Sequence, residues 1–129
     1  MGTHPRPHEH PALEGKVALC VSLVEEKKAE GVLALDLRGI SSVTDYFLFC
    51  HGTSDRQVQA IADHLVAMMK KKGLKALGVE GYPEARWILL DFGDLVIHVF
   101  YEETRLFYDL ERLWSHAPQI YPPHEKVPS

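Results

Sequence analysis

The stretch that decides the fold runs from residue 86 to residue 100 and reads RWILLDFGDLVIHVF. Two apolar runs flank Gly93-Asp94, and a Gly-Asp pair in that position is typical of a tight β-hairpin turn. A two-residue turn gives three pairs: Phe92 with Leu95, Leu90 with Ile97, and Ile88 with Val99. Because side chains alternate along a strand, these six apolar residues share one face, which we predict to join the core.

The opposite face of the hairpin mixes large apolar side chains with an acid and an imidazole: Trp87, Leu89, Asp91, Val96, His98 and Phe100. A purely internal face has no need for Asp91 or His98, and a solvent face has no need for Trp87. One interpretation is that this face binds a protein partner, since apolar groups beside polar ones mark such surfaces. The other is that a helix covers it, with Asp91 and His98 at the rim. The pattern alone leaves both open.

Composition bounds the class of protein. The chain has 129 residues, 46% of them hydrophobic and 25% charged, which suits one globular domain. Its formal net charge of −4 argues against direct DNA binding and favours a basic protein partner. We expect no membrane span and no secretory signal, and therefore a cytoplasmic protein whose Cys20 and Cys50 are buried, reduced thiols.

The chain divides into three parts. Residues 1–12, with three prolines and three histidines, are predicted to be a flexible arm, and residues 117–129, with four prolines, a mobile tail. The histidines of the arm lack the cysteine or acid framework of a structural metal site, so no metal or cofactor is expected. Residues 13–116 are predicted to form one α/β domain with a mixed sheet of about five strands flanked by helices.

Helices are expected over residues 13–30, 54–72 and 102–114, and strands over 32–37, 45–50 and 77–79 in addition to the hairpin. Gly31 and Gly73 are the predicted helix stops. In the second helix Ser54 and Gln57 fit a capping box, and the lysines at 70–72 suit the negative helix end. The last helix is expected to bury one side, formed by Leu106, Leu110, Leu113 and Trp114.

Two patterns suggest enzymes. Gly52-Thr53-Ser54, between a strand and a helix, resembles the opening of the nucleotidyltransferase fold. That chemistry needs an Asp-x-Asp pair on the next strand to hold metal ions, and the chain has only Glu80 and Asp91. Asp91-Phe92-Gly93 spells the kinase magnesium motif without the other kinase motifs. We predict no catalytic residue. A nucleotide-binding enzyme using Ser54, Glu80 and Asp91, and an RNA-binding module, are the alternatives.

Five motifs, in register from about Leu13 to Trp114, resemble the ribosome silencing factor family (RsfS, Iojap). They begin at Asp36, Gly52, Gly78, Trp87 and Arg105. In that order they read D-x-x-G-x-S-S-x-T-D, G-T-S-x-R-x-V-x-x-I-A-D, G-V-E-G, W-x-x-x-D-x-G-D-x-V-x-H-x-F and R-x-x-Y-x-L-E-x-L-W. The resemblance implies a nucleotidyltransferase-like fold without catalysis, and a cytoplasmic homodimer.

The resemblance also implies a partner. This is ribosomal protein uL14 of the large subunit, bound at the face that would meet the small subunit. Occupying that face would block subunit joining sterically and repress translation when nutrients fall. Carried over position by position, the partner-binding residues are Trp87, Leu89, Asp91, Asp94, Val96 and His98. Trp87 would be the buried anchor, and the two aspartates would face basic side chains.

Overall fold

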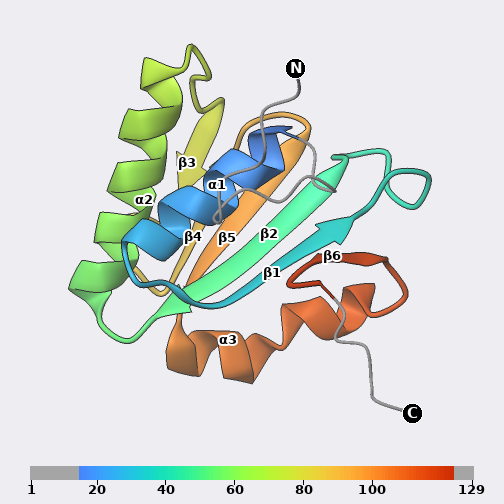
Figure 1. Cartoon of the computed structure of the whole chain (residues 1–129). Helices are drawn as coiled ribbons and strands as arrows, with labels where there is room; N and C mark the ends of the chain where they lie inside the picture. Colours follow the sequence, from blue (N-terminus) through green and yellow to red (C-terminus); the bar gives the residue numbers. More distant parts are fainter. Residues whose placement is uncertain (1–14, 124–129) are drawn as a thin grey trace.

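A mixed sheet runs through the molecule, and helices lie on both sides of it (Figure 1). The computed structural model describes residues 15–123. The strands are β1 (Glu30–Asp36), β2 (Tyr46–Gly52), β3 (Gly78–Glu80), β4 (Trp87–Asp91), β5 (Leu95–Tyr101) and β6 (Gln119–Tyr121). They lie in the order β3-β4-β5-β2-β1-β6; β2 and β5 are parallel and the other neighbours antiparallel. The predicted α/β class is therefore confirmed, with six strands in place of about five.

The hairpin of β4 and β5 has the predicted register. Leu90 pairs with Ile97 and Ile88 pairs with Val99. The Phe92 amide donates to the Leu95 carbonyl at 2.9 Å, which closes the two-residue turn. Gly93 in that turn has a φ of 88°, a left-handed conformation that glycine adopts without strain. The turn chemistry read from the sequence thus fixes the pairing of β4 with β5.

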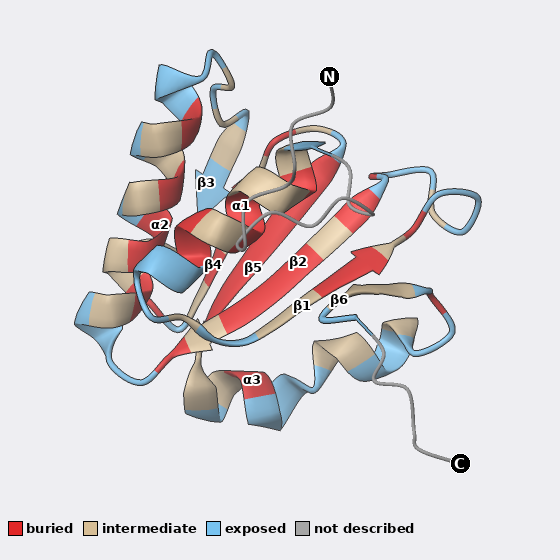
Figure 2. Cartoon of the chain, viewed as in Figure 1, coloured by how far each residue is buried: buried red, intermediate tan, exposed pale blue. Residues whose placement is uncertain are grey.

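Each face of the sheet carries a separate hydrophobic cluster. The helices α1 (Gly15–Glu26) and α2 (Asp55–Lys71) cover one face, where all six predicted core residues of the hairpin lie buried. The other face carries a smaller cluster around Phe49 and Phe100, against which the 3₁₀ helix η1 (Leu110–Trp114) packs through Leu110 and Trp114. Buried residues run along the central strands (Figure 2). The sheet therefore has a thickly covered face and a thinly covered one.

The start of α2 follows the predicted capping box. The Ser54 hydroxyl accepts from the Gln57 amide at 3.0 Å, and the Gln57 side-chain oxygen accepts from the Thr53 amide at 2.8 Å. These bonds satisfy backbone donors that a helix start leaves open. The helix ends before Gly73, whose φ is 79°, as predicted.

Two helix ends differ from prediction. The first helix stops at Glu26, not near Gly31, because Lys28 takes the left-handed conformation and the Ala29 amide bonds back to the Val24 carbonyl. The expected helix over 102–114 is interrupted at Asp109, whose φ of 48° is left-handed. It becomes α3 (Glu102–Tyr108) followed by η1. Aspartate tolerates this conformation better than most residues, which lets the chain turn there.

The sixth strand lies in the segment predicted as an irregular tail. Within residues 117–123, β6 pairs with the edge of β1, and the Pro118 carbonyl accepts from the Asp36 amide at 2.9 Å. The arm at 1–12 lies outside the described residues, and so does the tail beyond 123. Cys20 and Cys50 are buried and no disulfide joins them, as predicted. Within residues 15–123, no helix combines the length and apolar character that crossing a bilayer requires.

Candidate protein-binding face

Trp87 lies on the thinly covered face of the sheet, at the start of β4. Its ring centroid is 5.1 Å from that of Phe100 and 5.3 Å from that of Tyr108, so it spans from the sheet to α3. The indole Nε1 donates to Nδ1 of His98 at 3.1 Å. Trp87 is half-buried, so part of the residue remains accessible to solvent. Such a ring suits the anchor of a protein interface.

His98 lies beneath Trp87 and is only 4% exposed. Its ring stacks on Phe49 at 5.0 Å and meets the edge of Phe47 at 4.8 Å. Burial lowers its pKa to about 4, because charging an imidazole in an apolar setting is unfavourable. His98 is therefore neutral at physiological pH, and in this arrangement it offers a partner almost no surface.

Four other residues complete the predicted set. Leu89 and Asp91 are half-buried on the same face as Trp87, and Asp91 Oδ1 accepts from the Gly93 amide at 2.8 Å. Val96 shares that face but is only 8% exposed. Asp94 is exposed in the hairpin turn and forms an ion pair with Lys16 of α1 at 2.6 Å. The structure thus brings five of the six onto one face and ties Asp94 toward α1.

The two interpretations of this face each describe one part of it. Beside Phe47, η1 packs against the sheet through Trp114, with 5.2 Å between the ring centroids, as expected if a helix covers this face. Leu89 and Asp91, further along β4, stay half-buried and reach solvent. His98 is not at the rim, as that alternative placed it, but under the aromatic side chains. An accessible apolar-and-acidic patch remains beside Trp87.

Sequence reasoning missed an exposed apolar strip on α3 and η1. The strip consists of Leu106, Phe107, Tyr108 and Leu113, which are 74%, 81%, 56% and 70% exposed. The expectation that Leu106 and Leu113 are buried on one helix side is wrong, because the break at Asp109 turns η1 away from the line of α3. The signal was present in the run Leu106-Phe107-Tyr108, since three adjacent large residues cannot share one buried side of a helix.

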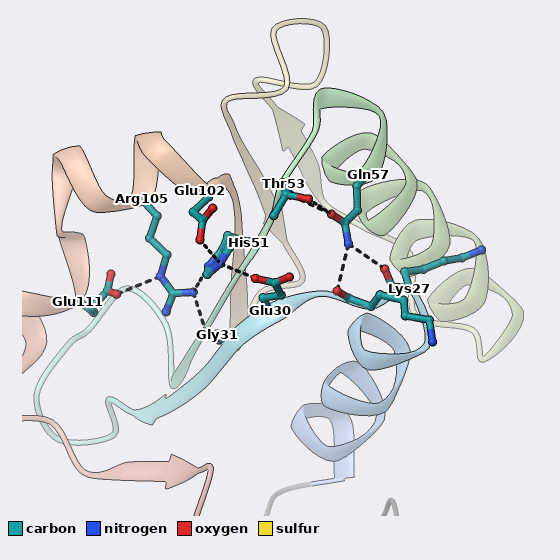
Figure 3. A network of polar contacts seen from close by, with 10 residues as sticks. Lys27, Glu30, Gly31, His51, Thr53, Gln57, Glu102, Arg105 and Glu111 are labelled. Carbon is teal, nitrogen blue, oxygen red and sulfur yellow. Dashed lines mark hydrogen bonds and ion pairs between the residues drawn. The ribbon is translucent and has the colours of Figure 1, made fainter.

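A buried arginine fastens α3 to the sheet (Figure 3). Arg105 Nε donates to Glu111 Oε1 at 3.0 Å, and its Nη1 donates to the Gly31 carbonyl at 2.7 Å. The same Nη1 lies 2.9 Å from His51 Nδ1. A Cβ on Gly31 would stand 2.5 Å from that nitrogen, so only glycine allows the approach. Arg105 thereby joins β1, β2, α3 and η1, and it holds the apolar strip in place.

The residues around His51 have the composition of a metal site but not its chemistry. Glu30, His51 and Glu102 bring one ligand atom each within 4.8 Å of one another. Arg105 has only N–H groups to offer, so His51 Nδ1 must accept and Nε2 must carry the ring hydrogen. That hydrogen points toward the two carboxylates, each 3.5 Å away, and a metal would need a lone pair there. The cluster is therefore a polar network.

Within residues 15–123, the residues named for the nucleotide-binding alternative do not converge on one site. The Thr53 and Gln57 amides at the start of α2 are already bonded within the capping box, and the Gln57 side-chain nitrogen also donates to the Lys27 carbonyl at 3.3 Å (Figure 3). Asp55 beside this box pairs with Arg86, which precedes β4. Asp91 lies at the other end of that strand, four residues beyond Trp87, or roughly 13 Å along an extended chain. Ser54 and Asp91 therefore sit at opposite ends of the sheet.

These observations define an α/β protein with a six-stranded mixed sheet, one face of which is only thinly covered. The family model described as "Ribosomal silencing factor during starvation" (RsfS) matches residues 9–129. The ribosomal silencing factor of Halalkalibacterium halodurans is 49% identical over 102 residues, covering 79% of this chain and 87% of that one. The chain belongs to the RsfS family, the ribosomal silencing factors.

Two further comparisons extend this result. A crystal structure of a protein from Bacillus halodurans aligns with a TM-score of 0.73 at 47% identity, covering 81% of this chain and 94% of that one. The mouse protein "Mitochondrial assembly of ribosomal large subunit protein 1" is 32% identical over 114 residues, covering 86% of this chain and 50% of its own length. The family and the fold are thus shown together.

The buried His98 makes stability depend on pH. In the unfolded chain its pKa is near 6.5, and in the folded protein burial lowers it to about 4. Between these pH values His98 is protonated in the unfolded chain but not in the folded protein. The free energy of unfolding therefore falls as the pH drops from about 6.5 to about 4. The shift corresponds to roughly 3 kcal/mol. Urea unfolding of the wild type at several pH values in this window should show the fall in the free energy of unfolding. The His98→Phe protein should show a smaller fall over the same window.

Proposed function

We propose that this protein is an anti-association factor of the ribosome. It binds ribosomal protein uL14 on the large subunit and occupies the face that the small subunit needs. It thereby represses translation in the cytoplasm when nutrients are limiting. Membership of the RsfS family supports the ribosomal target, and the name of the mouse relative ties that protein to assembly of the large subunit. The observation that carries the proposal is the half-buried Trp87 ring on the thinly covered face of the sheet.

The chemistry of the face fits a basic ribosomal protein. Trp87 and Leu89 supply apolar area, and Asp91 beside them supplies negative charge. Asp94 lies at the border of this patch and is exposed, so it can meet a lysine or arginine of the partner beside its own ion pair with Lys16. The net charge of −4 favours approach to a positively charged surface. Val96 and His98 are buried, so they support the patch by packing beneath it.

Silencing of this kind needs no bond-making residue. Two subunits cannot join while a folded domain stands between them, so affinity and position are sufficient. The lack of a convergent carboxylate set around Ser54 and Asp91 is consistent with such a steric role, and so is the closed capping box at Gln57. The proposal therefore depends on a surface, and surface substitutions should separate binding from folding.

We also propose that the chain forms a homodimer through the apolar strip on α3 and η1. Four large side chains exposed on so short a segment are unusual for a monomer and typical of an interface. Phe107→Glu should convert a dimer into a monomer in analytical ultracentrifugation while leaving the fold intact, because Phe107 is 81% exposed. Glu103→Gln, at an exposed site of the same helix, is the matched control. A Phe107→Glu dimer as tight as the wild type would place the interface elsewhere.

The direct test of silencing is co-sedimentation with isolated large subunits on a gradient, with small subunits then added. We expect the protein to travel with large subunits and joined ribosomes to decline. A large subunit reconstituted without uL14 should lose the protein. If the protein fails to bind large subunits, the proposal is wrong, and magnesium-dependent nucleotide binding by calorimetry becomes the next measurement.

A further inference from the structure

The orientation of the Trp87 ring is set by one buried side chain. A tryptophan half-exposed on a sheet can adopt several rotamers, and a hydrogen bond to its indole selects among them. Here Nε1 donates to Nδ1 of His98 at 3.1 Å, across neighbouring strands. The bond directs the ring over Phe100 and against Tyr108.

The acceptor is held more firmly than the ring that it orients. His98 is 4% exposed, stacks on Phe49 and contacts the edge of Phe47. Both phenylalanines belong to β2, in the centre of the sheet. The imidazole therefore stays in place if the Trp87 ring rotates, so the hydrogen bond can form in only one orientation of that ring.

The same bond leaves the other imidazole nitrogen without a partner. Because Nδ1 accepts, Nε2 carries the hydrogen, and within residues 15–123 this buried N–H finds no acceptor. An orphaned buried donor lowers stability. A phenylalanine would fill nearly the same space among these aromatic rings without that donor. Packing alone therefore does not explain a histidine at this position, whereas an acceptor for Trp87 does.

Resting on the proposed function, we propose that His98 is a positioning residue: it holds the Trp87 ring in the orientation that docks on the ribosomal protein, and it does not touch the partner itself. An anchor fixed before binding loses less conformational freedom when the complex forms, so affinity rises without any new contact.

Two substitutions at this one position separate the acceptor from the packing. His98→Phe keeps an aromatic ring on Phe49 and removes the acceptor. His98→Asn keeps an acceptor, since its Oδ1 lies two bonds from Cβ like Nδ1 of histidine, and removes the ring. The first readout is the indole N–H signal of Trp87 in a ¹H–¹⁵N spectrum of the free protein. Trp114, the other tryptophan, serves as the internal control.

The second and third readouts are the thermal midpoint and the affinity for isolated large subunits. We expect His98→Phe to shift the Trp87 signal alone, to keep or raise the midpoint, and to bind about tenfold more weakly. His98→Asn should lower the midpoint yet keep the indole signal and bind within about threefold of wild type. Stability and affinity would then move in opposite directions, which a merely structural role cannot produce.

Other results overturn the inference. Wild-type affinity for His98→Phe would mean that the bond does not matter for docking. An affinity that follows the midpoint in both variants would assign His98 a structural role. A wild-type protein that does not bind large subunits overturns the proposed function and this inference with it. In that case the indole signal of the free protein still reports whether the hydrogen bond exists, so the two failures are distinguishable.

Discussion

Trp87→Ala should weaken binding to the large subunit by about 2 kcal/mol or more, which is roughly 30-fold, while leaving the fold intact. The ring is a large, half-buried apolar group on the thinly covered face, and Leu89 on the same strand is half-buried too. Truncation removes the anchor and also exposes the top of His98. Quantitative co-sedimentation gives the affinity, and circular dichroism with the thermal midpoint checks the fold.

The control for this experiment is another apolar truncation at an accessible site. Met68→Ala truncates a half-buried side chain of α2, which covers the opposite face of the sheet, so its affinity should stay at the wild-type value. Unchanged binding by a folded Trp87→Ala protein would move the partner surface away from β4. An unfolded Trp87→Ala protein would show that the ring serves the core more than the surface.

Arg105→Ala should lower the free energy of unfolding by roughly 3 kcal/mol. It deprives Glu111 Oε1, the Gly31 carbonyl and His51 Nδ1 of their shared donor. Removing one member of a buried ion pair is costly because the other charge stays desolvated. The effect lies at the low end of the usual range because the Glu111 side chain is 27% exposed. Urea unfolding measures this free energy, with the dependence on urea concentration expected to have the same slope as for the wild type.

Two comparisons identify the source of that loss. Arg112→Ala removes an exposed arginine from η1 and should change stability little. Combining Arg105→Ala with Glu111→Ala should cost less than the two single changes added together, since the two side chains share one contact. Strict additivity would mean that the Arg105–Glu111 bond contributes nothing, and that the bonds to Gly31 and His51 carry the effect.

The hairpin could be predicted because its turn residues and its apolar pattern lie close together in the sequence and agree with each other. A two-residue turn at Gly93 places six apolar residues on one face, and a slip by one residue would move the apolar set of one strand to the other face. The same reasoning selected Trp87 and the mixed face, and the start of α2 at Ser54. In each case the deciding partners lie within about ten residues along the chain.

What could not be predicted depends on contacts distant in sequence. Arg105 bonds to a carbonyl 74 positions away, so its burial leaves no local pattern. The left-handed Asp109 follows from where α3 is fastened to the sheet, and propensity alone would have continued the helix. The burial of His98 needs Phe47 and Phe49 from β2 beneath and beside it. Sequence reasoning thus grouped these residues on one face of the sheet, but it did not predict that His98 is buried there.

The short strand β6 affects how readily the protein aggregates at high concentration. It covers the outer side of β1, a seven-residue strand that would otherwise offer a long unpaired edge. The edges that remain, β3 and β6, have three residues each. Such stubs are poor templates for another chain to extend. A protein shortened before residue 117 would expose β1 and tend to join edge to edge into aggregates, so the proline-rich end of the chain protects its solubility.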